Sequence, residues 1–172
     1  MEKIEAYLVG EIVWSVDSDA FTLNKKSNFG ELKDGKIQYS LAEAVFLVEK
    51  EKMEVFSKNK KLSKKDFIEK CGKVDKKIQI KYPVFRDLRE RGYIVKTALK
   101  FGADFRVYDK GYSPDESHSK WIVFCEHESR GLTWHEFSAK NRVAHSTKKH
   151  LLLAVVDEEG DISYYEVRWT KP

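Results

Sequence analysis

The sequence predicts an α+β N-terminal domain over residues 1–75, followed by an α/β C-terminal domain over residues 76–172 with a mixed central sheet flanked by helices. Three observations lead to this prediction. The chain has 172 residues, which suits one ordinary domain or two small ones. A polar, lysine-rich stretch over residues 58–65 and 73–77 marks a boundary. Beyond it, helix-patterned and strand-patterned segments alternate.

The predicted N-terminal domain begins with strands. Residues 7–14 read as one strand with a central glycine, and residues 21–23 as a second short strand. The pair Asp34-Gly35 predicts a hairpin turn. Ser40 precedes apolar residues at helical spacing, and Ser63 precedes a second such pattern, so each serine is expected to cap a helix.

The predicted C-terminal domain alternates helices and strands. Two helices are expected, over residues 80–91 and 133–149; Pro83 fits the first turn of one, and a Thr133…Glu136 capping box begins the other. Five strands are expected, and they cover residues 93–97, 104–108, 121–125, 151–156 and 162–169. The segments 121–125 and 151–156 are apolar enough to be buried on both faces of a sheet.

Composition excludes several classes of protein. Aromatic residues make up 13% of the chain, which supplies core material that disordered chains lack. No apolar run approaches the roughly 18 residues of a membrane span, and the N-terminus lacks a signal-peptide pattern. Cys71 and Cys125 lie far apart and form no disulfide framework or metal-ligand spacing, so a reducing cytoplasm is the expected setting.

The net charge of +4 is too small to indicate by itself that the protein binds nucleic acid. It is unevenly distributed, because residues 1–75 hold 14 basic and 14 acidic side chains, whereas residues 76–172 hold 18 and 14. All five histidines also lie in the second half. Chemistry near neutral pH is therefore expected in the C-terminal domain.

Common cofactor and metal motifs are missing. The sequence has neither a phosphate-binding G-x-x-x-x-G-K-[ST] loop nor a dinucleotide-binding G-x-G-x-x-G turn. Its histidines do not have metal-ligand spacing, and the acidic run at residues 157–161 reads locally as a solvated hairpin tip. The expectation is an activity with no cofactor and no metal.

Three side chains remain as candidates for chemistry. His118 ends a polar loop before a buried strand, Tyr108 ends the preceding strand, and Lys148 and Lys149 close the long helix. Each alone is typical of an ordinary structural position: a surface histidine, a half-buried sheet tyrosine, cations at a helix C-terminus. Together they suit metal-free RNA cleavage, which needs a base, an acid and a cation.

Longer motifs in the second half resemble the catalytic domain of archaeal tRNA-splicing endonucleases. The residues that carry the resemblance are Tyr82–Thr97, Lys100–Tyr108, His118-Ser119, Leu132-Thr133, Arg142–Ser146, Lys149–Asp157, Tyr164-Tyr165 and Lys171-Pro172. The similarity covers nearly all of residues 78–172 with its spacing intact. The first half is similar only in size and in the helix start at residues 40–44.

The resemblance implies a tyrosine, histidine and lysine triad. Tyr108 falls at the position of the general base, His118 at the position of the general acid, and Lys149 at the position of the cation that stabilises the transition state. Lys149 is preferred to Lys148 because the following Leu-Leu-Leu-Ala block fixes the register. The resemblance also implies two residues that clamp a flipped-out base: Arg142 matches one, and either Arg168 or Trp169 matches the other. His145 is expected to be a buried structural histidine, and Asp104 a structural acid.

The resemblance further implies substrate and assembly. Family members cut precursor tRNA at a bulge-helix-bulge and leave 2′,3′-cyclic phosphate and 5′-hydroxyl ends without a metal. Two cuts need two active sites, so a chain with one site is expected to form a homotetramer (a dimer of dimers) or a heterotetramer with a structural subunit. The loop 157–161 then matches an acidic loop that docks on a neighbouring dimer, and the last strand would pair with its symmetry mate.

Two alternatives stay open. One is a non-catalytic RNA-binding or assembly subunit of a heteromeric splicing endonuclease, against which the retained Tyr108, His118 and Lys149 argue. The other is a metal-dependent DNA nuclease of similar topology, which would need an acidic metal cluster. Neither alternative expects a membrane as partner.

Overall fold

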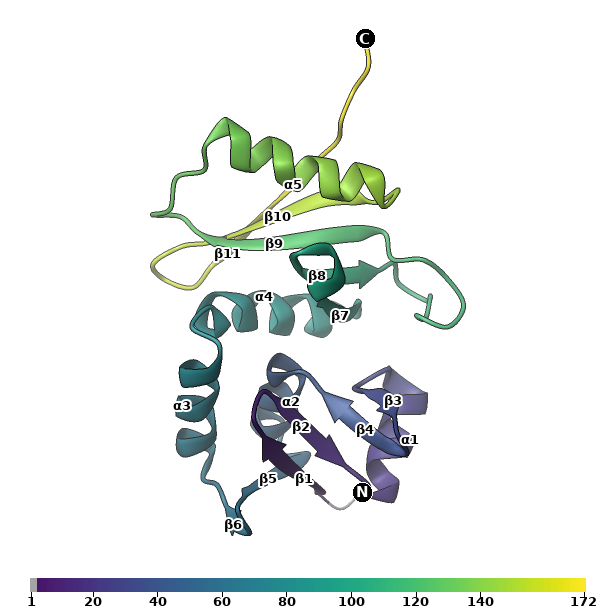
Figure 1. The fold of residues 1–172 in the computed structure, drawn as a ribbon, viewed down its shortest axis with the longest axis vertical. Helices are drawn as coiled ribbons and strands as arrows, with labels where there is room; N and C mark the ends of the chain where they lie inside the picture. The colour runs from purple at the N-terminus through teal and green to yellow at the C-terminus, as the bar shows by residue number, and fades with distance from the viewer. Residues whose placement is uncertain (1–2) are drawn as a thin grey trace. The chain divides into compact units, whose positions relative to one another are not determined.

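The computed structural model describes residues 3–172, which form two compact units, one ending at Tyr82 and the other beginning at Pro83 (Figure 1). The division of the chain between the two units falls within helix α4 (Ile78–Glu90). The boundary predicted between residues 75 and 76 falls just before that helix. Among the described residues, no helix has the length and apolar character needed to cross a lipid bilayer.

The N-terminal unit is built on a six-stranded sheet with the strand order β3-β4-β2-β1-β5-β6. Its strands are β1 (Ile4–Val9), β2 (Ile12–Ser15), β3 (Glu31–Lys33), β4 (Lys36–Tyr39), β5 (Met53–Ser57) and β6 (Lys60–Lys61). Its helices are α1 (Ser18–Ser27), α2 (Leu41–Glu49) and α3 (Lys64–Val74). Strands β1 and β5 pair in parallel, and the other pairs are antiparallel, which is the predicted α+β character.

Local sequence explains several of these elements. The Ser40 hydroxyl accepts the amide of Glu43, and the Glu43 carboxylate accepts the amide of Ser40, so the capping box satisfies two orphan donors at the start of α2. Ser63 caps α3 as predicted. Asp34 and Gly35 have φ angles of 50° and 73°, as a two-residue hairpin turn between β3 and β4 requires.

Two expectations for this unit were wrong. Residues 7–14 form two antiparallel strands, because Gly10 (φ 61°) and Glu11 make a tight turn that pairs Val9 with Ile12. Residues 21–23 lie inside helix α1, which begins after the Asp17 cap and ends at Asn28 in the left-handed region. The side chain of Asp17 caps the first turn of a helix, and this start signal favours helix over strand for the short apolar run at residues 21–23.

The C-terminal unit is built on a five-stranded mixed sheet with the strand order β11-β10-β9-β8-β7. The strands are β7 (Ile94–Ala98), β8 (Ala103–Tyr108), β9 (Trp121–His127), β10 (His150–Val156) and β11 (Ile162–Val167). The pair β9–β10 is parallel and the others are antiparallel. The predicted fold class is confirmed.

Helix α5 (Trp134–Ser146) packs on β10 and β9 of this sheet, and a short 3₁₀ turn, η1 (Leu99–Phe101), joins β7 to β8. Ala144 of α5 is buried against Ile122 and Leu151 of the sheet. Thr133 and Glu136 form the predicted capping box. Pro83 lies inside α4 rather than in its first turn, because that helix begins at Ile78, two residues earlier than expected.

Candidate active site

Three neighbouring inner strands bring the predicted catalytic residues to one side of the sheet, where β8 ends and β9 and β10 begin. Val107 of β8 pairs with Trp121 of β9, and Trp121 pairs with His150 of β10. The Lys120 amide donates to the Val107 carbonyl at 2.8 Å, and the His150 amide donates to the Lys120 carbonyl at 3.0 Å. Tyr108, one residue after Val107, and Lys149, one residue before His150, therefore flank Lys120 at the same edge.

Tyr108 ends strand β8 and is only 3% exposed. The guanidinium carbon of Arg106, on the same strand, lies 6.0 Å from the centroid of the tyrosine ring. At this distance the guanidinium lies at the outer limit of a cation–π contact with the ring. Arg106 is a candidate that the sequence did not reveal, because an arginine on a strand carries no motif.

His118 lies on the exposed loop between β8 and β9, two residues before Lys120. Its neighbour Ser119 is buried, and among the described residues its hydroxyl oxygen has no hydrogen-bond partner. Asp109, at the start of the loop, accepts from Lys120 at 3.2 Å, and this bond is the main cause that lowers the pKa of the Asp109 carboxyl. The loop is thus tied to the edge of the sheet.

A helix-ending turn positions Lys149. Beyond Thr147 at the end of α5, the Lys148 amide donates to the His145 carbonyl and the Lys149 amide to the Ala144 carbonyl. These two bonds make a Schellman motif, which requires the left-handed conformation that Lys148 has (φ 57°). The turn leads directly into β10 and therefore fixes the Lys149 backbone at the site.

The ammonium group of Lys149 donates to the Thr147 carbonyl at 3.1 Å and lies 5.5 Å from the centroid of the Phe101 ring. Burial, and second the positive charge of Arg106, lower the pKa of Lys149. A half-buried cation without full hydration suits the stabilisation of charge that develops on a phosphate.

The predicted RNA-binding residues divide into two groups. Arg168 and Trp169 follow β11 and, with Lys149, line a hollow of about 280 Å³. Trp169 is 59% exposed and its ring lies 4.8 Å from that of His145, whereas the Arg168 guanidinium pairs with Glu166 at 2.6 Å. Arg142 is exposed on α5 and is not among the residues that line the hollow.

His145 does not have the role expected of it. It lies in the last turn of α5, is exposed, and packs its ring against Trp169, so it is not a buried structural histidine. The expectation failed because Ala144 is the residue of this helical turn that packs on the sheet, so its neighbour His145 lies on an exposed face of α5.

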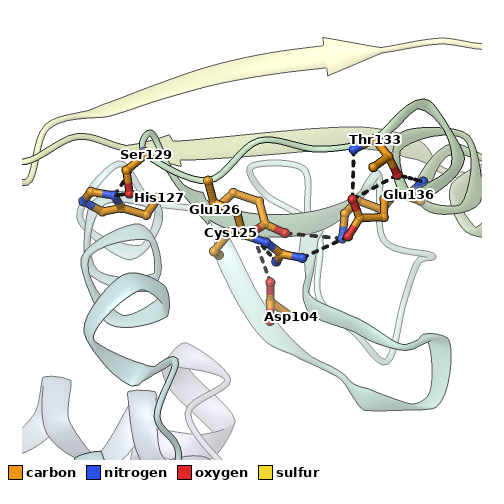
Figure 2. A network of polar contacts seen from close by, with 9 residues as sticks. Asp104, Cys125, Glu126, His127, Ser129, Thr133 and Glu136 are labelled. Atoms are coloured by element: carbon orange, nitrogen blue, oxygen red, sulfur yellow. Dashed lines mark hydrogen bonds and ion pairs between the residues drawn. The ribbon is translucent and has the colours of Figure 1, made fainter.

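A polar network attaches α5 to the sheet (Figure 2). Glu126 of β9 is buried and pairs with Arg130 at 2.9 Å and with Lys140 of α5 at 3.3 Å. Two cations compensate the cost of burying this carboxylate. Asp104 accepts the Cys125 amide at 2.8 Å, which is the structural role expected of it. Among the described residues, no three His, Cys, Asp or Glu side chains lie together as metal ligands would.

Comparison with known proteins identifies the family. Residues 78–164 match the model of the tRNA intron endonuclease catalytic C-terminal domain, and residues 4–68 match the model of the N-terminal domain of the same family. The chain belongs to the tRNA intron endonuclease family. The predictions of the family and of an enzyme are thereby confirmed.

Individual relatives in the family cover the chain almost completely. The chain is 44% identical to the tRNA-splicing endonuclease of Pyrococcus furiosus, over 98% of this chain and 97% of the relative. It is 45% identical to that of Pyrococcus horikoshii, over 99% and 98%, and 39% identical to that of Methanothermobacter thermautotrophicus, over 99% of both chains. The similarity therefore includes the N-terminal unit, which the sequence motifs matched only loosely.

Proposed function

We propose that this chain excises introns from precursor tRNA by cutting at bulge-helix-bulge junctions in the cytoplasm. The reaction needs no metal and leaves 2′,3′-cyclic phosphate and 5′-hydroxyl ends. One observation carries the proposal. The register of β8, β9 and β10 brings Tyr108, Lys149 and the loop of His118 together where β8 ends and β9 and β10 begin. Family membership supplies the substrate class.

The three side chains divide the chemistry between them. Tyr108 accepts the proton of the 2′-hydroxyl, whose oxygen attacks the phosphorus. The bond between phosphorus and the 5′-oxygen breaks as His118 donates a proton to that oxygen. Lys149 stabilises the extra negative charge on the phosphorane between these steps. Because Tyr108 is buried in the single chain, neighbouring residues must move when RNA binds.

The hollow beside Lys149 supports the assignment of the RNA-binding residues. A base stacked on the exposed face of Trp169 would place its phosphate near the cations of the hollow, and Arg168 lies there as well. Arg142 approaches the RNA from α5 and supplies the opposing clamp. Either Trp169 or Arg168 can stack on the base: the Trp169 ring is 59% exposed, and the exposed ion pair between Arg168 and Glu166 costs little to break.

Two cuts per intron require at least two chains. We propose a homotetramer, or a heterotetramer with a structural subunit, in which the acidic loop 157–161 docks on a neighbouring dimer. The Asp157 carboxylate accepts the amides of Glu159 and Asp161 at 2.9 Å each, which holds the loop in one shape. Glu158 and Glu159 are exposed at its tip.

Cleavage of a bulge-helix-bulge RNA in excess EDTA tests the proposal. We expect two cuts, cyclic phosphate ends, and a loss of about 10²-fold or more in rate for His118→Ala with RNA binding retained. His127→Ala is the matched control, because His127 belongs to the same strand–loop unit but lies at the opposite end of β9. Cleavage only with Mg²⁺ would overturn the mechanism, and cleavage only with an added partner would point to a heteromeric enzyme.

A further inference from the structure

The positive charge of the N-terminal unit is concentrated in one segment. Residues 57–77 hold nine lysines against three acids, a net charge of +6, whereas residues 1–56 hold 7 basic and 11 acidic side chains. Within residues 1–75, whose net charge is 0, residues 1–56 carry a net charge of −4 and residues 57–75 a net charge of +4. The basic segment comprises the end of β5, the strand β6 and helix α3.

The basic segment encloses a groove of about 510 Å³, here called the lysine groove. It is lined by five lysines: Lys58, Lys60, Lys61, Lys70 and Lys73. Asp66 and Glu69 also line it, so the lining has an excess of three positive charges. Glu69 pairs with Lys73 at 2.8 Å, but both side chains are largely exposed, and such a pair contributes little.

A neighbouring hollow shows that this excess is local. That hollow, of about 270 Å³, shares Lys61 and Leu62 with the lysine groove. Its other charged residues include Lys3 and Lys64, and three glutamates, Glu49, Glu51 and Glu54, balance its three lysines. Lys61 pairs with Glu54 at 2.7 Å and Lys64 with Glu49 at 4.0 Å. Glu54 thus offsets part of the charge of Lys61, and the positive excess of the lysine groove rests mainly on Lys58, Lys60 and Lys70.

The β5–β6 turn has a lysine at a backbone position that disfavours residues with a Cβ atom. Lys58 and Asn59 both have positive φ angles, 47° and 63°, in the tight turn that pairs Ser57 with Lys60. Glycine or asparagine is the usual residue at the first of these positions, because a Cβ atom is strained there. The turn places Lys58 among the residues that line the lysine groove.

We propose that the lysine groove is a second RNA-binding site, which takes the phosphate backbone of a double-stranded part of the substrate. This inference rests on the proposed function. Lysines act as separate point charges that suit successive phosphates. Lysine is depleted from the centre of protein–protein interfaces, and the groove has Leu62 as its apolar lining residue, so a protein partner fits less well.

The lining also identifies the form of RNA. None of the groove's lining residues is aromatic, so single-stranded bases would have no side chain on which to stack. A-form helices are recognised by shape and by phosphate contacts, which require only cations at suitable spacing. The site therefore contributes affinity without sequence preference, in a domain to which no catalytic residue is assigned.

The test compares two triple variants of the full chain. Lys58→Ala, Lys60→Ala and Lys70→Ala together remove three cations from the lysine groove. Lys25→Ala, Lys33→Ala and Lys52→Ala together remove three exposed cations from the rest of the unit, so both variants have the same net charge. Binding of a precursor tRNA is measured from about 50 to 200 mM salt, and cleavage is measured at saturating RNA.

We expect the groove variant to bind about tenfold or more weakly at 0.1 M salt, with a log–log salt slope smaller by about two to three. Its cleavage rate at saturating RNA stays that of the unaltered chain, and the control variant binds normally. Equal salt slopes for both variants would refute the site. Because binding is read separately, a chain that binds but does not cut refutes the proposed function and not this one.

Two further results are decisive. If the groove variant loses its assembly state in light scattering while each chain still binds RNA normally, the groove takes an acidic protein segment and the proposal is wrong. If the triple variant fails to fold, Lys60→Gln replaces it, since that exposed side chain lies in a two-residue strand at the edge of the sheet. An unchanged salt slope for Lys60→Gln and for Lys70→Gln then overturns the inference.

Discussion

Replacing Lys148 by glycine should make the protein more stable. Lys148 is the left-handed residue of the Schellman turn that follows α5 (φ 57°), and its side chain is exposed. A residue with a Cβ atom costs about 1–2 kcal/mol in this conformation. Glycine removes that cost but adds about 0.4–1 kcal/mol of chain entropy to the unfolded state. The net gain is about 0.5–1 kcal/mol, or about 1–4 °C in the melting temperature for a chain of this size.

Two control variants separate the effect of backbone strain on stability from the effect of the lysine charge. Circular dichroism monitors the thermal unfolding of all variants. Lys148→Ala removes the charge and keeps the Cβ atom, so its melting temperature should stay within about 1 °C. Ser138→Gly, at an exposed position in the middle of α5, should lower stability by about 0.5 kcal/mol. If Lys148→Gly and Lys148→Ala shift the melting temperature alike, strain at Lys148 is not the cause. The cleavage rate at saturating RNA should survive in the glycine variant, because the amides that hold Lys149 in place are retained, whereas RNA affinity should fall, because Lys148 lines the hollow beside Lys149.

Three other changes test separate parts of the structure. Tyr164→Phe removes the hydroxyl that donates to Asp87 at 2.7 Å, and should lower the free energy of unfolding in urea by about 1.5 kcal/mol; an unchanged value would deny the bond any net contribution. Because burial lowers the pKa of Lys149, cleavage should fall at a less alkaline pH than an exposed lysine would give, and Lys149→Arg should move that fall upward. The stability cost of charging Lys149 is fully present below its folded pKa and disappears as pH rises past it. Replacing Glu158 and Glu159 by lysine should convert tetramers to dimers in light scattering, whereas tetramers that persist would contradict the docking role of the loop.

The sequence predicted most elements of the C-terminal unit because their signals are local. The apolar run at residues 151–156 and the capping box at Thr133 each specify one element by themselves. Element ends were less predictable. Helix α5 ends at Ser146, and the chain then turns at Lys148, which has the left-handed conformation. Glycine is the usual residue at such a position, so a lysine there does not indicate the end of the helix in the sequence.

The N-terminal unit was predicted in class and not in detail. The two-residue turn at Gly10-Glu11 was hidden in an apolar stretch, so two strands were taken for one. The Asp17 cap of α1 could have been found, because aspartate before a run of helix-compatible residues is a start signal. The pairing of β1 with the distant β5 could not, since a parallel contact leaves no trace in local periodicity.

The candidate site was located through family resemblance, and the structure adds what spacing cannot give. No periodicity places Tyr108 and Lys149 on either side of Lys120; the strand register does. Arg106 was not predicted, although it lies over the Tyr108 ring and lowers the pKa of Lys149. Arg106 and Tyr108 are neighbours on β8, but the effect of Arg106 on Lys149 depends on how β8 and the turn before β10 lie in space, which no local pattern encodes.

The net charge of +4 does not predict how this protein binds RNA, because salt screens charges that lie far from the bound phosphate. Charges in solution are screened over about 8–10 Å at physiological salt, so a phosphate responds to the cations near it and not to the total. Residues 57–77 present +6 in one segment, while the acids of the 157–161 loop lie in the other unit. A basic groove and an acidic loop can therefore bind opposite partners in one nearly neutral chain. Their effects should be separable, because changing the lysines alters the salt dependence of RNA binding, and changing the acids alters assembly.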